Sequence, residues 1–314
     1  MSAAARSAPP AVLVLACRRP ALTQRLLGFL VAQGVTDLHV VVDGPRDTPG
    51  DAQRVEETRE VVRRFELPRE RLWLRERNLG GPVGVPEAID WFFASRERGV
   101  ILEDDLLPDA SFLPFAAELL ERYAGEPRVA GIHGWSCVLE ASPYSYHFSR
   151  YAPGWGWATW ASRWKAFDRE GRLWKEVDAE RVLREASEGD PSFVHYWMTV
   201  FRRVYEGGRL NWDYRWLFVN FVQRWLTATA SVNLVENSGF GEGASNTMAP
   251  LFFLLPVREM AFPLRHPPRV EADRRADLHT HRASFLQDRA SRMRYRLARW
   301  RARLTGTGPA APRP

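Results

Sequence analysis

The feature that most constrains the fold is a regular alternation of short apolar runs and helix-like segments over residues 11–102. The apolar runs are continuous, as in strands buried on both faces, and they lie at 11–16, 38–42, 71–74 and 99–102. The segments between them have apolar residues at helical spacing and lie at 20–33, 48–65 and 85–95. This order predicts an α/β fold with a mostly parallel sheet and helices on both faces.

Beyond residue 102 the pattern predicts one more helix and one more strand, at 111–123 and 129–132. The tryptophans that follow are unusually dense, because ten of the thirteen in the chain lie between Trp135 and Trp225. Flat aromatic faces suit stacking on sugar rings or bases. We therefore expect a smaller, Trp-rich binding region after the first sheet.

Composition excludes several classes of protein. The chain has 314 residues, of which 45% are hydrophobic and 26% charged, as is ordinary for a soluble globular domain. No run of about 18 apolar residues occurs, so no transmembrane helix is expected. Two cysteines, Cys17 and Cys137, cannot form a disulfide framework and lack the spacing of zinc ligands. A catalytic lysine would have to be Lys165 or Lys175, because all other basic residues are arginine.

The charge distribution separates the end of the chain from its body. The net charge is +6, but residues 282–303 alone carry eight arginines and one acid, or +7, which leaves about −1 elsewhere. A body without a basic stripe predicts no nucleic-acid partner. Residues 285–304 have the pattern of a basic amphipathic helix, so 282–304 could contact an anionic membrane at its surface. The alternative is a helix packed on the body, or a solvated tail.

The beginning of the chain favours a cytoplasmic protein. Residues 1–10 are rich in Ala, Ser and Pro and are expected to be a disordered leader. Residues 11–17 faintly resemble an export signal, but Arg18 and Arg19 follow at once, which favours a buried first strand. We expect a cytoplasmic location, where the tail could place the protein at the inner face of the membrane.

The triplet Glu103-Asp104-Asp105 is the most informative candidate site. Three adjacent carboxylates follow the apolar run 100–102, and ligands of parallel sheets bind where the strands end. A divalent cation would relieve the repulsion between them, and Mg²⁺ or Mn²⁺ prefers oxygen ligands. The alternative is a solvated acidic turn that caps the next helix.

Two further residues follow predicted strands at the same edge of the sheet. Asp43 could accept a hydrogen bond from a uracil or ribose group, and Arg19 could face a nucleotide. The alternatives are a turn-forming aspartate in the sequence Asp-Gly-Pro and a surface arginine. His133 and His195 stand alone in the sequence and are expected to be structural.

Five segments together resemble the nucleotide-sugar glycosyltransferases of the GT-A fold. The likeness is to the N-acetylglucosaminyltransferase I family and its bacterial relatives, and it extends over residues 11–250. The segments occur in the family's order and are Val-Leu-Val-Leu-Ala-Cys-Arg-Arg (12–19), Val-Val-Val-Asp-Gly (40–44), Val-Ile-Leu-Glu-Asp-Asp-Leu (100–106), Pro-Gly-Trp-Gly-Trp (153–157) and Asn-Trp-Asp (211–213).

The resemblance implies a role for each matching residue. Asp105 would bind the metal, Mn²⁺ or Mg²⁺, and Asp213 would be the catalytic base. The residues implied to contact the donor are Arg19, Asp43, Glu103, Asp104, Trp157 in the Pro-Gly-x-Gly-Trp loop, and Gly241 in the loop Glu-Asn-Ser-Gly-Phe-Gly-Glu-Gly (236–243). From the residues alone, Asp213 could instead cap a helix or pair with Arg215, and the Gly-rich loop could be a tight turn.

The predicted organisation and function follow from that resemblance. We expect a nucleotide-sugar-binding subdomain at 11–135, an acceptor and catalytic subdomain at 136–255, and a linker with the basic tail at 256–314. The predicted reaction moves a sugar from a nucleoside diphosphate sugar, with UDP-sugar favoured, to a hydroxyl of a glycan or a lipid-linked acceptor. One base and one metal predict inversion at the anomeric carbon.

Three other functions compete with this prediction. A sugar nucleotidylyltransferase would share the sheet and the carboxylates but normally has a glycine-rich loop and a lysine after the first strand. A glycoside hydrolase would use two carboxylates that flank the scissile bond and would need neither nucleotide nor metal. A non-catalytic carbohydrate-binding protein would explain the tryptophans but not the acidic triplet.

Overall fold

The computed structural model describes residues 8–138, 142–208, 211–239 and 255–285. The first half alternates strands and helices as the sequence predicts. Its strands are β1 (Val12–Ala16), β2 (Leu38–Val42), β3 (Leu72–Leu74) and β4 (Arg98–Glu103). Its helices are α1 (Pro20–Ala32), α2 (Asp51–Arg63), a 3₁₀ turn at Arg69–Arg71, and α3 (Gly80–Phe93).

The second half is less regular and contains more short elements. Its strands are β5 (Leu106–Pro108), β6 (Val129–His133), β7 (Tyr146–Ser149), β8 (Trp157–Trp160), β9 (Leu226–Ala230) and β10 (Val235–Asn237). Its helices are α4 (Phe112–Arg122), α5 (Ala161–Trp164), α6 (Leu173–Glu176), α7 (Ala179–Ala186), α8 (Pro191–Tyr205), α9 (Trp212–Val222) and α10 (Arg274–Ser284).

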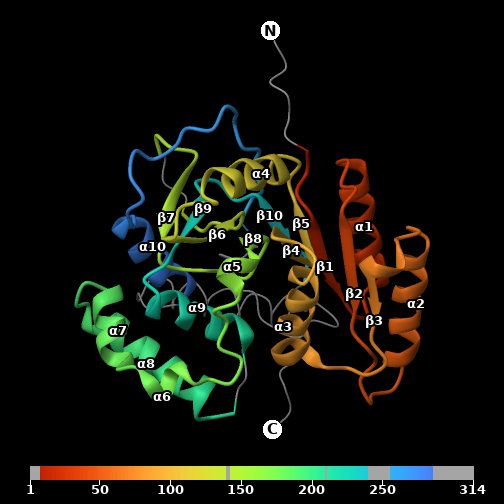
Figure 1. The fold of residues 1–314 in the computed structure, drawn as a ribbon, viewed down its shortest axis with the longest axis horizontal. Helices are drawn as coiled ribbons and strands as arrows, with labels where there is room; N and C mark the ends of the chain where they lie inside the picture. The colour runs from red at the N-terminus through yellow and green to blue at the C-terminus, as the bar shows by residue number, and fades with distance from the viewer. Residues whose placement is uncertain (1–7, 139–141, 209–210, 240–254, 286–314) are drawn as a thin grey trace, which may run out of the picture.

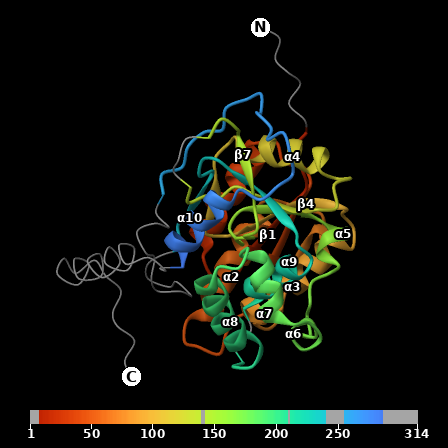
Figure 2. The ribbon, with the colours of Figure 1, turned by 90° about the vertical axis from the view of Figure 1, so that its left-hand side faces the viewer.

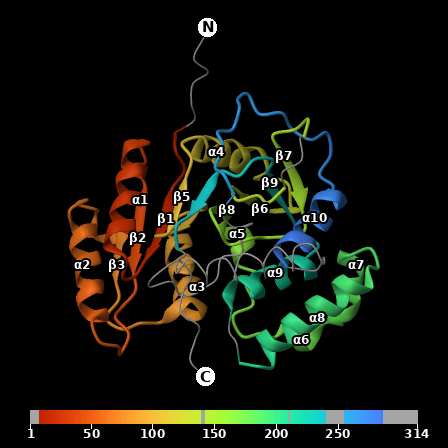
Figure 3. The same cartoon turned by 180° about the vertical axis from the view of Figure 1, so that it is seen from behind.

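One eight-stranded sheet joins the two halves, in the order β3-β2-β1-β4-β8-β6-β9-β7. Strands β1 to β4 are parallel, β8 runs antiparallel between β4 and β6, and β7 runs antiparallel to β9. A small antiparallel sheet of β5 and β10 follows the end of β4. Figure 1 shows the first half (red to yellow) beside the second (green to blue), and Figure 3 shows them from behind.

Helices cover both faces of this sheet, which confirms the predicted fold class. Side chains of a strand alternate between faces, so Val12 and Val14 of β1 pack with α1 and α4, whereas Leu13 packs on the opposite face. The core on that opposite face is formed with α3, α7, α8 and α9 and is rich in aromatic rings. None of the helices in the described ranges combines the length and apolar character that a membrane span requires.

Most of the clustered tryptophans belong to this core rather than to a binding surface. Seven of the ten are buried: Trp135, Trp157, Trp160, Trp164, Trp197, Trp212 and Trp216. Their rings pack against each other, as Trp157 does on Trp212, with centroids 6.0 Å apart. Trp135 and the partly exposed Trp155 line a pocket described below.

Helix α10 corrects the expectation of a linker from residue 256. Asp273 is its N-cap and accepts a hydrogen bond from the Ala276 backbone N–H at 3.0 Å. The helix packs beside β7, as Figure 2 shows, and the Asp273 N–H donates to the Phe148 carbonyl at 2.7 Å. Phe285, the first residue of the expected amphipathic helix, packs against Trp197, with ring centroids 4.7 Å apart. Residues 286–304 of that expected helix lie outside the described residues.

Candidate functional site

A pocket of about 370 Å³ lies where the parallel strands β1, β2 and β4 end. Because these strands run in one direction, the residues after Ala16, after Val42 and at Glu103 meet at one edge of the sheet. Four of the predicted donor-binding residues line it, namely Arg19, Asp43, Glu103 and Asp104. The structure thus brings together side chains that are up to 85 residues apart in the sequence.

Arg19 is held by the acidic triplet. Its Nη1 donates to Asp104 Oδ1 at 3.0 Å and to Asp105 Oδ2 at 2.5 Å. Asp104 is only 6% exposed, and the backbone N–H of Cys17 donates to its other oxygen at 3.3 Å. Burial raises the pKa of Asp104 to about 6 despite the attraction of Arg19. Arg19 is therefore an ion-pair partner of the triplet as well as a lining residue of the pocket.

Glu103 is a carboxyl of the triplet whose charged form is strongly disfavoured. Burial raises its pKa to about 8, and the neighbouring charges of Asp105, Asp104 and Asp213 add to this effect. Buried carboxylates of this kind do not form a solvated turn. They also do not cap α4, because the N-cap of that helix is Ser111, whose backbone N–H donates to the Asp109 carboxylate at 2.8 Å.

The chemistry of these groups fits a divalent cation. Crowded carboxylates in a buried place favour the approach of positive charge, and their oxygens are the ligands that Mg²⁺ and Mn²⁺ prefer. Within the described ranges, no three or more His, Cys, Asp and Glu side chains are grouped as a complete protein-built metal centre would require. A metal held here would therefore take few protein oxygens and complete its coordination with other ligands.

The loop after β10 lies directly against Asp105. The Ser238 backbone N–H donates to the Asp105 carbonyl at 2.8 Å. Gly239 approaches so closely that a Cβ there would lie 2.0 Å from Asp105 Oδ2. The predicted donor residue Gly241 lies outside the described residues, but the part of its loop that is described reaches the acidic triplet.

Asp43 holds the beginning of helix α3. Its carboxylate accepts from the backbone N–H groups of Leu79 at 3.1 Å and Gly80 at 3.0 Å. It also accepts from the next residue, Gly44, at 3.1 Å, which is the turn-forming role that the sequence left open. Asp43 therefore shapes the pocket that it lines, and its carboxylate is already partly engaged.

Arg75 is a pocket residue that the sequence interpretation missed. It follows β3 directly, is 5% exposed, and places its guanidinium 4.3 Å from the centre of the Trp73 ring. Its Nη1 lies 3.7 Å from Asp43 Oδ1, while its Nε and Nη2 have no hydrogen-bond partner among the described residues. Burial lowers its pKa. Its position at the end of a parallel strand was the available signal.

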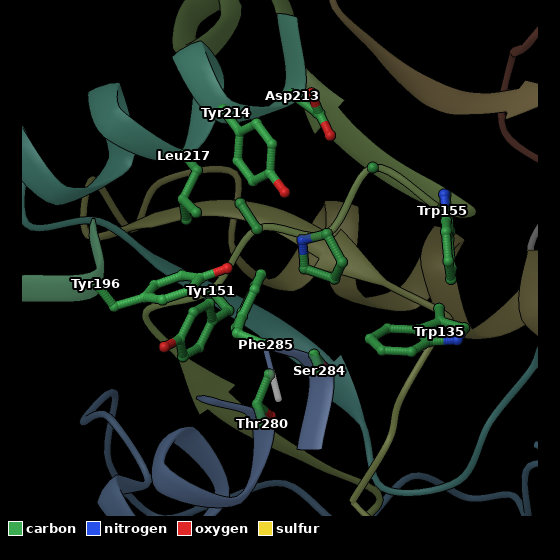
Figure 4. Close-up of a pocket in the computed structure, with 13 residues that line it drawn as sticks. Trp135, Tyr151, Trp155, Tyr196, Asp213, Tyr214, Leu217, Thr280, Ser284 and Phe285 are labelled. Carbon is green, nitrogen blue, oxygen red and sulfur yellow. The ribbon is translucent and has the colours of Figure 1, made fainter. Parts of the chain in front are cut away.

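A second pocket of about 290 Å³ is lined mainly by aromatic rings (Figure 4). We call it the aromatic pocket, and it is lined by Trp135, Tyr151, Ala152, Pro153, Gly154, Trp155, Tyr196, Asp213, Tyr214, Leu217, Thr280, Ser284 and Phe285. Loop 151–155, helices α8 and α9 and the end of α10 supply most of these residues. The predicted Pro-Gly-x-Gly-Trp loop thus contributes its first three residues to the aromatic pocket.

Among the described residues, Asp213 is the one carboxylate that lines the aromatic pocket. It lies in the first turn of α9, and burial raises its pKa above the usual value. The N-cap of α9 is Asn211, and Arg215 donates to the Arg169 carbonyl at 2.7 Å. Arg215 is therefore not the partner of Asp213, whereas the Asp213 carboxylate does accept from the backbone N–H of Tyr214 in the first turn of α9, as the capping alternative expects. The charge of Asp213 contributes to the raised pKa of Glu103, so the carboxylate that lines the aromatic pocket acts electrostatically on a triplet residue that lines the strand-end pocket.

Trp157 corrects the predicted site. It lies in strand β8 and is 1% exposed, between the rings of His133 and Trp212, at centroid distances of 6.1 and 6.0 Å. A side chain packed in this way cannot contact a donor. Pro153, Gly154 and Trp155 of the same loop are the residues that border a pocket.

Comparisons with known proteins give little further information. No family model and no curated protein matches the chain. Among solved structures, the chain is similar to a mannose-1-phosphate geranyltransferase from Thermus thermophilus, with 14% identity and a TM-score of 0.31. The match covers 70% of this chain and 73% of that one. A likeness this weak carries no argument about function.

Proposed function

We propose that this protein is a glycosyltransferase that moves a sugar from a nucleoside diphosphate sugar to an acceptor hydroxyl. The observation that carries the proposal is that Asp213, which lines the aromatic pocket, acts electrostatically on Glu103, which lines the strand-end pocket. One pocket has the polar lining and the strand-end position of a nucleotide site, and the other presents the carboxylate Asp213. We propose that the donor sugar lies at the triplet, on the side from which Asp213 acts on Glu103.

The strand-end pocket suits the nucleotide part of the donor. Asp43 supplies acceptor oxygens, and Arg75 supplies N–H donors that lack hydrogen-bond partners among the described residues. Together they could pair with the edge of a pyrimidine such as uracil. Asp105 is proposed to hold Mn²⁺ or Mg²⁺ on the diphosphate. When bound, that ion would supply Lewis-acid stabilisation of the charge on the leaving group.

Asp213 is proposed as the general base. Its carboxylate would take the proton of the acceptor hydroxyl as that oxygen attacks the anomeric carbon. The bond from the anomeric carbon to the diphosphate oxygen breaks in the same step, and the nucleoside diphosphate leaves. A single displacement of this kind inverts the configuration at the anomeric carbon.

A donor screen with Mn²⁺, which measures nucleoside diphosphate release and the product anomer by NMR, tests this function. Asp213→Asn keeps the shape of the side chain but cannot accept the proton, so transfer is expected to fall by about 10²–10⁴-fold. Nucleotide binding, measured by calorimetry, should persist in this variant. A retained anomeric configuration, or full activity of Asp213→Asn, would contradict the mechanism. Release of pyrophosphate from a nucleoside triphosphate would instead indicate a nucleotidylyltransferase.

A further inference from the structure

We propose that the aromatic pocket selects an acceptor in which the reacting hydroxyl is attached to, or lies one sugar away from, an aryl ring. This inference rests on the proposed function, because it names the class of acceptor for the same site. Simple phenols and aryl glycosides belong to this class. Fully hydrophilic sugars of the same size do not.

The walls of the pocket form an ordered aromatic surface. Tyr151 and Phe285 lie nearly parallel, with an interplanar angle of 25° and centroids 5.5 Å apart. Trp135 and Trp155 form the other side and meet edge to face, with centroids 5.3 Å apart. Figure 4 shows these two pairs on either side of the pocket, with Asp213 and Tyr214 above them. An aryl ring of a ligand would pack against these side chains in the same offset or edge-to-face geometry.

Several polar groups of the lining are already engaged within the protein. The Tyr151 hydroxyl lies 3.0 Å from His281 Nδ1, and the hydroxyls of Thr280 and Ser284 lie 3.6 and 3.5 Å from Cys137 Sγ. A bare sugar ring would bring several hydroxyls that need partners here, and unpaired polar groups are costly to bury. An aryl ring needs none.

The size and position of the pocket agree with one ring beside the reacting group. Its volume of about 290 Å³ is at the lower limit for small-molecule sites, which are usually about 300–1,000 Å³. Asp213 is part of the lining, so a hydroxyl beside a ring bound in this pocket would lie near the proposed base.

Binding of phenyl β-D-glucopyranoside and methyl β-D-glucopyranoside to the full chain tests the proposal. Both affinities are measured by calorimetry, with and without UDP and Mn²⁺, and saturation-transfer NMR identifies the ligand protons that contact the protein. We expect the phenyl glycoside to bind at least about tenfold more tightly, with the strongest transfer to its ring protons. Equal affinities, or no binding of either glycoside at millimolar concentration, would overturn the proposal.

Two variants locate the ring. Ser284→Phe places a bulky side chain in the aromatic pocket and should remove the preference for the phenyl glycoside. Ser162→Phe makes the same change at an exposed position of α5 and should keep it. Tyr196→Ala removes a wall of the pocket and serves if Ser284→Phe unfolds. A preference that survives in both pocket variants would exclude this pocket. These measurements need no turnover, so a failure of glycosyl transfer would leave the result on binding intact.

Discussion

Asp213 shows how the surroundings of one residue set its chemistry. Burial in the first turn of α9 disfavours its charged form and raises its pKa above the usual 3.8. A carboxylate accepts a proton only while it is ionised. The raised pKa therefore moves the pH at which the proposed base becomes active upward, towards neutral pH, where a base matches its task best.

The pH dependence of turnover should report this shift. As the pH falls through the raised pKa, Asp213 becomes protonated, so kcat is expected to decline with a midpoint above 3.8. Measurement of kcat over the acid to neutral range at saturating donor checks this. The residual activity of Asp213→Asn should lack the same decline. An identical acid limb in both proteins would show that another group controls it.

For single residues, the sequence indicated which side chains have the right chemistry for the site, but not which of them the fold would bury. The triplet, Arg19, Asp43 and Asp213 could be found because each follows a strand or matches a motif, and these positions are local in the sequence. The burial of Trp157 could not be found, because it depends on the pairing of Trp157 with His133 and Ile101 across two other strands. Arg75 was missed because its partner Asp43 directly follows a different strand, β2, and does not lie beside it in the sequence.

At the scale of elements, the short strand β10 matters more than its length suggests. It pairs with β5, directly after the acidic triplet, and leads into Ser238 and Gly239. The absence of a side chain at Gly239 lets this loop contact the Asp105 carboxylate, which in turn binds Arg19. Position 239 is therefore coupled to the proposed metal ligand through direct contact.

Gly239→Ala is expected to displace Asp105 and lower metal-dependent turnover by at least about tenfold. The added Cβ would lie 2.0 Å from Asp105 Oδ2, which is too close for either group to stay in place. Gly28→Ala in α1 is the matched control, since its Cβ would meet nothing within 4 Å. That control should keep turnover and gain about 0.5–1 kcal/mol of stability, because alanine favours the helix. Turnover and urea unfolding are measured for both, and normal turnover of Gly239→Ala would contradict the role of Asp105.

Helix α10 shows why one element was missed. Residues 256–281 contain several prolines and charges, which are typical of a linker, and the N-cap Asp273 was the only strong helix signal. The helix is stabilised by distant contacts instead. Asp277 accepts from the Ser149 hydroxyl at 2.6 Å, and His281 contacts Tyr151. Contacts between residues so far apart in the sequence leave no local pattern to recognise.

At the scale of the whole molecule, the parallel half was predictable and the mixed half was not. Each strand-helix-strand unit of residues 11–102 is continuous in the sequence, so its pattern predicts its own fold. Strand β8 enters the sheet between β4 and β6, and β9 pairs with β6 although many helices separate the two in the sequence. The order of those strands depends on which surfaces pack together, which a local pattern does not contain.

The described residues include buried histidines with lowered pKa values and buried aspartates with raised pKa values. Burial lowers the pKa of His133 to about 3 and those of His147 and His281 to about 4. The unfolded chain, with His near 6.5, therefore takes up more protons as the pH falls, and these histidines destabilise the fold in acid. Burial raises the pKa of Asp104 and Asp277 to about 6, so these groups have the opposite effect. The contributions should partly cancel between about pH 6 and 4.

Single substitutions that remove one buried histidine or one buried aspartate should reveal these opposite effects on stability in acid. His147→Leu removes a group whose lowered pKa favours unfolding below pH 6.5, so the variant should gain stability relative to the natural chain as the pH falls to about 4. Asp277→Asn removes a carboxyl whose stabilising effect is present below about pH 4 and lost as the pH rises through about 6. This variant should therefore lose stability relative to the natural chain over the same acid range. Its Oδ1 can still accept from the Ser149 hydroxyl and the Arg150 backbone N–H.

The two relative slopes should have opposite signs and a size of about 1.4 kcal/mol per pH unit each. Urea unfolding of the three proteins at about pH 4.5, 5.5 and 6.5 measures them. The two sites are neighbours, since β7 holds His147 and contacts α10, which holds Asp277. A general loss of packing would lower the free energy of unfolding by the same amount at every pH. A change in the number of protons bound on unfolding instead changes the slope of that free energy against pH. Parallel stability curves for all three proteins would show that these groups titrate alike in the folded and unfolded chain, and that their burial does not control acid stability.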